Sequence, residues 1–271
     1  MVGPAWTKLR SIRAPCRKSV PRGSALAAGC EAAKPQLTWR ITFENKGSVT
    51  NQHSSKQVRA LHLIAGLLVF AVMTLTLGEI AEDVRDGEPL TLTDVRFSNW
   101  LHTNGSPPLS KVMWIITSLH ASVVICGAAV LVGLYLWRRR QLFWVAALWL
   151  SVFGGVLLNN ILKLIFHRAR PNFSDTVQAL TTYSFPSGHT MIATVFYGSL
   201  AAFVIGTSKS WPLRILSVAI ALTLILLVAF SRIYVGAHYL SDVLGAMAEG
   251  FAWIALSLTG LYYFWNRTRS R

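Results

Sequence analysis

The chain has 271 residues, of which 53% are hydrophobic and only 14% are charged. Soluble domains carry about 25% charged residues, so this composition argues against a soluble protein and for a membrane protein. The net charge of +15 is compatible with nucleic-acid binding, but most of the basic residues flank apolar segments, which argues against that function.

Residues 1–57 are polar, basic and rich in Ser, Pro and Gly, and they show no lasting helical or strand periodicity. This pattern is typical of a disordered tail. The segment lacks the apolar core of a secretory signal peptide, whereas an organelle transit peptide and a misplaced start codon both remain open. The tail contains Cys16 and Cys30, and Cys126 lies in an apolar segment; their spacing indicates no disulfide or metal site.

Six apolar segments follow, each near or above the ~20 residues that a helix needs to cross a bilayer. They are residues 58–80, 112–137, 142–166, 188–207, 213–235 and 240–265. A lipid-exposed backbone must satisfy its own hydrogen bonds, so we expect an all-α integral membrane bundle of six transmembrane helices. The predicted domains are the tail (1–57), a six-span domain (58–265) and a basic C-terminus (266–271).

With six crossings, both termini lie on one side of the membrane. That side carries 19 of the 26 lysines and arginines, including the three arginines at 138–140. The positive-inside rule therefore places both termini in the cytoplasm. The loops 81–111 and 167–186 then lie on the extracytoplasmic face.

Basic residues and a glycine-containing turn meet on that face. Lys163 and Arg170 in "KLIFHRARP" are seven residues apart, which puts them on one side of a helix if the helix persists. Together with Arg232 they make three fixed cations, and guanidinium groups match phosphate oxygens well. Ser187 and Gly188 stand at the entrance of the fourth span, where backbone amides favour an anion. These five residues predict a phosphate-binding site.

Three further residues on the same face could carry out a reaction. His238 and Asp242 are spaced i, i+4, so the carboxylate can hold one ring nitrogen and leave the other free as a nucleophile. His189 comes from another span and could protonate a leaving oxygen. This set predicts phosphoryl transfer through a phosphohistidine. The three cations take the place of a metal ion, so we expect a metal-independent reaction with no cofactor.

The three motifs together resemble the signature of the type-2 phosphatidic acid phosphatase superfamily. They are Lys-x6-Arg-Pro at 163–171, Pro-Ser-Gly-His at 186–189 and Ser-Arg-x5-His-x3-Asp at 231–242. The resemblance covers roughly residues 58–265, and the membrane members of the family also have six spans. It implies that His238 attacks phosphorus, that Asp242 supports it and that His189 protonates the leaving group. It also implies a metal-independent enzyme whose phosphate ligands are Lys163, Arg170, Ser187, Gly188 and Arg232.

We therefore predict a lipid phosphatase, in a bacterial plasma membrane, with its active site on the extracytoplasmic face. Undecaprenyl diphosphate, phosphatidic acid and phosphatidylglycerophosphate remain candidate substrates, and the sequence does not indicate an oligomeric state. A lipid-to-lipid phosphotransferase of the same family is the main alternative. A non-catalytic binder of anionic lipids, such as a transporter or scaffold, would not need His238. A nucleic-acid-binding tail ranks lowest, because residues 1–57 contain no motif for it.

Five polar residues near these motifs receive no role from the sequence. His167 and Arg168 could contact phosphate or anchor the protein at the interface. Glu249 lies inside the sixth span, where an acid is either functional or hydrogen-bonded in the bundle. Asn159 could form such a bond, and His120 is expected to be a satisfied bundle residue.

Overall fold

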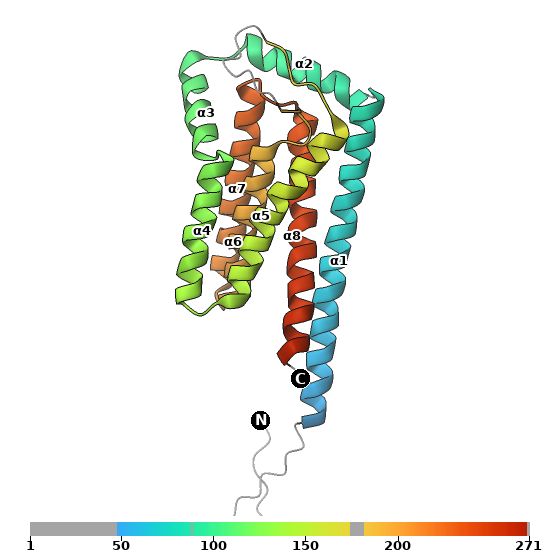
Figure 1. Cartoon of the computed structure of the whole chain (residues 1–271), viewed down its shortest axis with the longest axis vertical. Coiled ribbons are helices and arrows are strands. Elements are labelled where there is room, and N and C mark those ends of the chain that lie inside the picture. Colours follow the sequence, from blue (N-terminus) through green and yellow to red (C-terminus); the bar gives the residue numbers. More distant parts are fainter. Residues whose placement is uncertain (1–47, 88, 174–181, 270–271) are drawn as a thin grey trace, which may run out of the picture. The chain divides into compact units, whose positions relative to one another are not determined.

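The computed structural model describes residues 48–87, 89–173 and 182–269, and every regular element in these ranges is an α-helix (Figure 1). The helices are α1 (Ser48–Asp86), α2 (Pro89–Thr103), α3 (Pro107–Leu119), α4 (Ser122–Arg138), α5 (Leu142–Phe166), α6 (Gly188–Thr207), α7 (Trp211–Tyr234) and α8 (Leu240–Arg269). Five of these helices are long and apolar enough to cross a membrane, and the α3–α4 pair makes a sixth span if it counts as one. The predicted all-α membrane bundle is confirmed.

The helices at the two ends of the described chain are longer than the sequence suggested. Helix α1 begins at Ser48, so residues 48–57 are helical and do not belong to a tail, while residues 1–47 lie outside the described residues. Helix α8 continues to Arg269 and takes up most of the predicted C-terminal segment. The apolar part of α1 extends over Ala60–Asp86, which leaves a more polar first portion.

The second predicted span, 112–137, is not one straight helix. It consists of α3 and α4, which meet at a bend of 48°. His120 ends α3, and its ring bonds the carbonyl oxygen of Ile116 through Nδ1 (2.7 Å) and the hydroxyl of Tyr197 through Nε2 (2.8 Å). The expectation of a satisfied bundle histidine is met, and the same ring ties the bend to α6.

Helix α2 is a short helix within the loop 81–111 that the sequence did not predict. It lies across one end of the bundle, over the C-terminus of α7 and the N-terminus of α8 (Figure 1). Its buried positions are Asp94, Ser98 and Leu101, spaced as on one helix face, while Trp100 is exposed. The carboxylate on the buried face has a role in the site described below.

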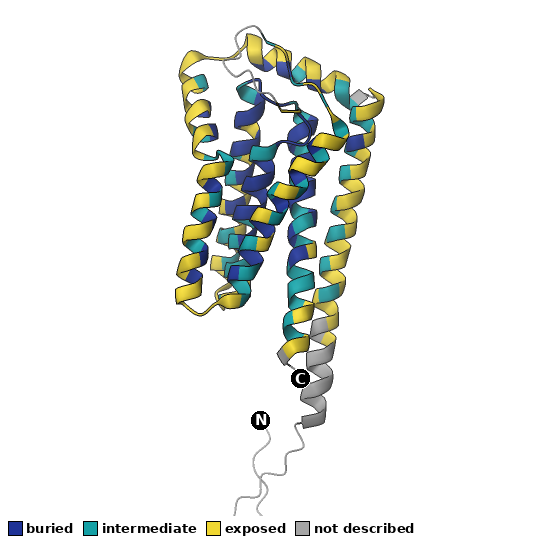
Figure 2. Cartoon of the chain, viewed as in Figure 1, coloured by how far each residue is buried: buried dark blue, intermediate teal, exposed yellow. Residues whose placement is uncertain are grey.

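The bundle is organised around α6 and α8, where buried residues are concentrated (Figure 2). Helix α6 packs against α5, α7 and α8, and the core between α4, α5, α6 and α8 includes Val152, Ile192 and Ala246. Helix α1 packs mainly on α8, and its apolar side chains are exposed on its other faces. Apolar side chains on the outside of a bundle are what contact with lipid requires.

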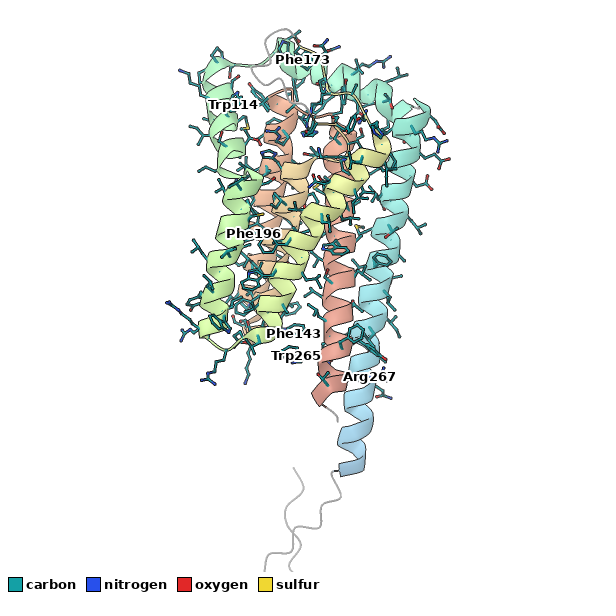
Figure 3. All side chains as sticks on the ribbon, viewed as in Figure 1. Trp114, Phe143, Phe173, Phe196, Trp265 and Arg267 are labelled. Atoms are coloured by element: carbon teal, nitrogen blue, oxygen red, sulfur yellow. The ribbon has the colours of Figure 1, made fainter. Side chains whose placement is uncertain are left out.

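The two ends of the bundle differ in chemistry. Figure 3 shows Trp114 and Phe173 toward the end that carries α2, and Phe143 and Trp265 toward the opposite end. At that opposite end lie the α4–α5 turn, with arginines at 138–140, and the α6–α7 turn. The residues predicted to react all belong to the end covered by α2.

Candidate active site

The turn between α7 and α8 presents His238. Gly236 has a φ of 69°, a left-handed conformation that glycine adopts without strain, and the chain reverses there. The backbone amides of Ala237 and His238 then donate to the carbonyl oxygen of Arg232 (3.1 and 3.2 Å). This turn buries the His238 side chain almost completely.

The two ring nitrogens of His238 face opposite charges. Nδ1 lies 3.3 Å from Oδ2 of Asp242, and Nε2 lies 3.1 Å from Nη1 of Arg170. A guanidinium can only donate, so Nε2 accepts and the proton of the neutral ring resides on Nδ1. Burial lowers the pKa of His238 to about 3, although Asp242 acts to raise it. The ring is therefore neutral near pH 7, with the lone pair of Nε2 directed toward Arg170.

Asp242 is held in place from several sides. Its Oδ2 accepts from Nδ1 of His238, from the hydroxyl of Ser184 and from the backbone amide of Tyr239 (2.9 Å). Its Oδ1 accepts from Nη1 of Arg168 at 2.6 Å. The predicted i, i+4 pair thus exists in the structure, and Ser184 and Arg168 are additional partners. Four donors fix one carboxylate in a single orientation.

The three predicted cations lie within electrostatic range of one another, and Arg170 contacts Nε2 of the ring. Besides contacting His238, Arg170 donates to the carbonyl oxygens of Thr182 and Ala237 (both 2.8 Å). Nζ of Lys163 donates to the carbonyl oxygen of Tyr183 at 2.9 Å, and Nη1 of Arg232 donates to Oγ1 of Thr117 at 2.5 Å. The structure brings the cations together as expected. Nε of Arg232 has no partner among the described residues.

Lys163 and Arg170 do not share a helix face. The sequence predicted a shared face only if the helix continued to Arg170, and it does not. Helix α5 ends at Phe166, and His167 follows in the left-handed conformation with a φ of 48°. Pro171 also disfavours helix at the residue before it. Arg170 therefore reaches the site from a loop, which explains how it can bond both the 182–183 segment and the α7–α8 turn.

The Pro-Ser-Gly-His motif begins α6 at the centre of the site. Ser187 is the N-cap residue, and its hydroxyl accepts from Thr190 (3.1 Å), so its own proton is directed elsewhere. Its backbone amide is already bonded to the carbonyl oxygen of Asp242 (3.0 Å). A Cβ at Gly188 would lie 3.3 Å from Oδ1 of Asn159, so this position is closely packed. The ring of His189 lies within electrostatic range of Arg232, His238, Lys163 and Arg170.

Four residues of the site were not assigned by the sequence. Arg168 was left open as a phosphate contact or an anchor, and it instead pairs with Asp242 and Asp94. Ser184 stands two residues before the motif at 186–189 and could have been suspected from that position. Asp94 and Thr117 carry no local sequence signal, because they reach the site only through α2 and the bent α3–α4 span.

The remaining residues have structural surroundings. His167 is exposed and packs edge-on against Tyr183, with ring centroids 4.3 Å apart. Oε2 of Glu249 accepts a hydrogen bond from Nδ2 of Asn159 at 2.8 Å, within the bundle. The described part of the chain contains no cluster of three or more His, Cys, Asp and Glu side chains that could hold a metal ion.

Known proteins resemble this chain in sequence and in fold. The PAP2 superfamily model matches residues 144–266. Phosphatidylglycerophosphatase B of Bacillus subtilis is 37% identical over 149 residues, which cover 53% of this chain and 71% of that protein. The chain belongs to the PAP2 superfamily. The resemblance predicted from the three motifs is therefore confirmed.

Two further comparisons place this PAP2 protein among membrane enzymes. Undecaprenyl-diphosphatase BcrC of B. subtilis is 31% identical over 51% of this chain and 68% of its own length. The crystal structure of a transmembrane PAP2-type phosphatidylglycerolphosphate phosphatase from B. subtilis superposes with a TM-score of 0.62 at 28% identity. That match covers 73% of this chain and 96% of the other. The residues matched by the PAP2 model, 144–266, include all three motifs but not Asp94 or Thr117.

Proposed function

We propose that this PAP2 protein is a membrane lipid phosphatase that hydrolyses a lipid phosphate monoester or diphosphate through a phosphohistidine on His238. The observation that carries the proposal is the environment of the His238 ring. Asp242 holds Nδ1, and the lone pair of Nε2 points toward Arg170. A neutral imidazole held in this tautomer is a competent nucleophile at neutral pH.

In the first step, Nε2 of His238 attacks the phosphorus atom and the bond from phosphorus to the leaving oxygen breaks. His189 donates a proton to that oxygen, so the lipid alcohol or lipid monophosphate departs. The phosphorylated ring carries positive charge with its proton still on Nδ1, and Asp242 stabilises that charge. Phosphoryl transfer needs such positioning and charge compensation more than further covalent chemistry.

In the second step, water attacks the phosphorus atom of the phosphohistidine. His189, now neutral, accepts a proton from the water, and the bond between phosphorus and Nε2 breaks. The electron pair returns to Nε2, inorganic phosphate leaves, and the two histidines regain their starting protonation states. A phosphotransferase would use the same steps with a lipid hydroxyl in place of water.

Three cations would bind the phosphoryl oxygens. Arg170 bonds the attacking atom directly, so the same N–H group is placed for an oxygen of a phosphate bound beside Nε2. Lys163 and Arg232 lie within electrostatic range of each other and of Arg170. The hydroxyl of Ser187 and the N-terminus of α6 at Gly188 complete the site. These fixed charges can neutralise the transition state without a metal ion.

The substrate and the location follow from the relatives and from the charges. Relatives named as phosphatidylglycerophosphatase and undecaprenyl-diphosphatase make these two lipid classes the first candidates, with phosphatidic acid as a third. Basic residues at 138–140, in the α6–α7 turn and at the end of α8 lie at the end opposite the site. We infer a bacterial plasma membrane protein with cytoplasmic termini and an extracytoplasmic active site.

The test is phosphate release by the purified full-length protein in detergent micelles, in excess EDTA, from each of the three lipids. We expect release by the wild type, no release by His238→Ala, and a ranking of lipids that identifies the substrate. Loss of wild-type activity on adding EDTA would contradict the metal-independent mechanism. If no lipid releases phosphate, an added acceptor lipid distinguishes a phosphotransferase from a binder.

A further inference from the structure

Asp94 is a buried carboxylate on α2, outside all three motifs. Its Oδ1 accepts from the backbone amide of Ser241 at 2.9 Å, and its Oδ2 accepts from the hydroxyl of the same serine. Oδ2 also lies 2.8 Å from Nη2 of Arg168. Asp94 is fully buried, so its charge is not screened by solvent and acts strongly on its neighbours.

Arg168 joins this carboxylate to the one beside His238. Its Nη2 pairs with Asp94, and its Nη1 pairs with Oδ1 of Asp242 at 2.6 Å and with the hydroxyl of Ser241 at 2.6 Å. The guanidinium also lies over the ring of Tyr239, with Cζ 4.5 Å from the centroid. The side chain is only 10% exposed. Arg168 is thus engaged with two acids, whereas Arg170 contacts the reacting nitrogen.

The second carboxylate alters the charge that His238 experiences. Asp242 must be negative to stabilise the ring when Nε2 attacks phosphorus. A guanidinium paired with Asp242 alone would cancel that negative charge. Asp94, Arg168 and Asp242 together carry a formal charge of −1, so the cation can orient Asp242 while the group stays anionic.

We propose that Asp94 and Arg168 are positioning residues for phosphoryl transfer, in which Arg168 orients Asp242 and Asp94 balances the charge of Arg168. The inference rests on the proposed function of His238 as nucleophile. Helix α2, which contributes no residue to the three motifs, thereby has a role in the reaction through Asp94. Arg168 pairs with Asp242 and Asp94 pairs with Arg168, so both residues act on His238 through Asp242.

The central variant is Asp94→Asn, which keeps the shape of the side chain and removes its charge. We expect kcat to fall about 10- to 100-fold, as when a group that orients a catalytic ligand is removed. The KM for the lipid and the inhibition constant for inorganic phosphate should change by less than about threefold, because the phosphate-binding cations are untouched. Asp94→Glu, which restores a carboxylate, should recover part of kcat.

The matched control is Ser98→Ala. Ser98 lies one turn from Asp94 on the same buried face of α2, and its hydroxyl has no partner among the described residues. This variant should leave kcat unchanged. Thermal unfolding of every variant in detergent separates a loss of kcat from a loss of fold.

A double-mutant cycle tests the pathway through Arg168. Arg168→Lys keeps one charge but cannot bond both carboxylates with a planar fork, so it should also lower kcat. If Asp94 and Arg168 act as a unit, the double variant with Arg168→Lys and Asp94→Asn should lower kcat little more than either single variant does. Additive losses would contradict the proposed unit. If Asp94→Asn does not fold, the kcat values of Arg168→Lys and Asp94→Glu test the proposal instead.

The outcomes separate this inference from the proposed function. An active wild type and an inactive His238→Ala, together with full kcat in Asp94→Asn, would overturn only the role of Asp94. A rise in KM and in the phosphate inhibition constant that matches the fall in kcat would show that Asp94 merely supports the fold. A wild type without phosphatase activity, or His238→Ala with full activity, would overturn the proposed function itself.

Discussion

His238 is held between a carboxylate and a guanidinium, and each partner has a different consequence. Asp242 fixes the proton on Nδ1, and Arg170 fixes the direction of the lone pair on Nε2. Ser184 and the amide of Tyr239 also donate to Oδ2 of Asp242, and Arg168 donates to its Oδ1, so the carboxylate cannot rotate away. The ring is therefore oriented before any substrate binds, which avoids reorganisation during the reaction.

Asp242→Asn tests the contribution of this charge. The amide has the size of the carboxylate but cannot stabilise a positively charged ring, and it can favour the wrong tautomer. We expect kcat to fall about 10³-fold or more, with a change in the phosphate inhibition constant below about threefold. Steady-state kinetics of phosphate release measures both quantities, with His238→Ala as the reference for an absent nucleophile. A kcat within about tenfold of the wild type would contradict the role of Asp242.

Burial of His238 also predicts a dependence of stability on pH. Burial lowers its pKa to about 3, against 6.5 for an exposed histidine. Between these values the unfolded chain binds a proton at this residue that the folded protein does not bind. The free energy of unfolding should therefore fall as the pH decreases from 6.5 toward 3, by up to about 1.4 kcal/mol per pH unit from this group.

The measurement for this prediction is thermal unfolding in detergent between pH 7 and pH 4, for the wild type and His238→Gln. Contributions from ionisable groups that do not interact with His238 are present in both proteins and cancel in the comparison. The wild type should lose stability more steeply than the variant as the pH falls. Parallel pH profiles would mean that His238 does not titrate as a buried, neutral residue.

At the level of elements, the bend between α3 and α4 directs part of a span toward the site. Helix α3 packs against α7, and this contact places Thr117 beside Arg232. Arg232 is almost completely buried, and the hydroxyl of Thr117 fixes one end of its guanidinium. If residues 112–137 formed one straight helix along the axis of α4, the part before His120, which contains Thr117, would follow a different course. The bend thus determines how Arg232, one of the three cations proposed to bind phosphate, is held.

Thr117→Val tests this function of the bend. Valine has nearly the same shape but removes the acceptor, and a hydrogen bond to a charged group contributes about 1.5–3 kcal/mol. We expect the inhibition constant for inorganic phosphate to rise roughly tenfold, because Arg232 loses its orientation. The control is Thr223→Val, which removes an exposed hydroxyl of α7 that bonds only the carbonyl oxygen of Ala219 in the described structure. Equal phosphate inhibition in the two variants would contradict the prediction.

In the helical bundle as a whole, the residues proposed to react and the basic surface residues lie at opposite ends. The residues proposed to react gather beneath α2, while the basic turns 138–140 and 208–214 are at the other end (Figure 1). Apolar side chains on the outer faces between the two ends match a lipid environment. A lipid with its phosphate at the membrane surface could therefore reach the site without leaving the bilayer.

Cysteine labelling tests the orientation of the bundle in the membrane. Asn104→Cys places a thiol at the end of α2, and Arg139→Cys places one in the α4–α5 turn; both positions are exposed. The background variant replaces the native cysteines with serine. In intact cells, a membrane-impermeant maleimide should label position 104 directly and position 139 only after permeabilisation. The reverse pattern would contradict the extracytoplasmic site.

Part of the site could be predicted from the sequence because it depends on short spacings. His238 and Asp242 lie one helical turn apart, and the N-terminus of α6 at Gly188 follows a recognisable start signal. The course of the chain after Lys163 was not predictable in the same way. His167 ends α5 in a left-handed conformation, which local sequence patterns do not encode for a histidine. The proximity of Lys163 and Arg170 therefore results from a loop and not from helix periodicity.

The amino-acid sequence by itself determined the membrane-spanning helices, the family and the residues of the three motifs, because hydrophobic length and local spacing are properties of short segments. Only the tertiary structure decided the partners that position those residues. Asp94 and Thr117 lie far from the motifs along the chain, and their contacts exist because α2 crosses the end of the bundle and α3 bends toward α7. Such contacts depend on how helices pack, and packing joins side chains that no sequence interval relates.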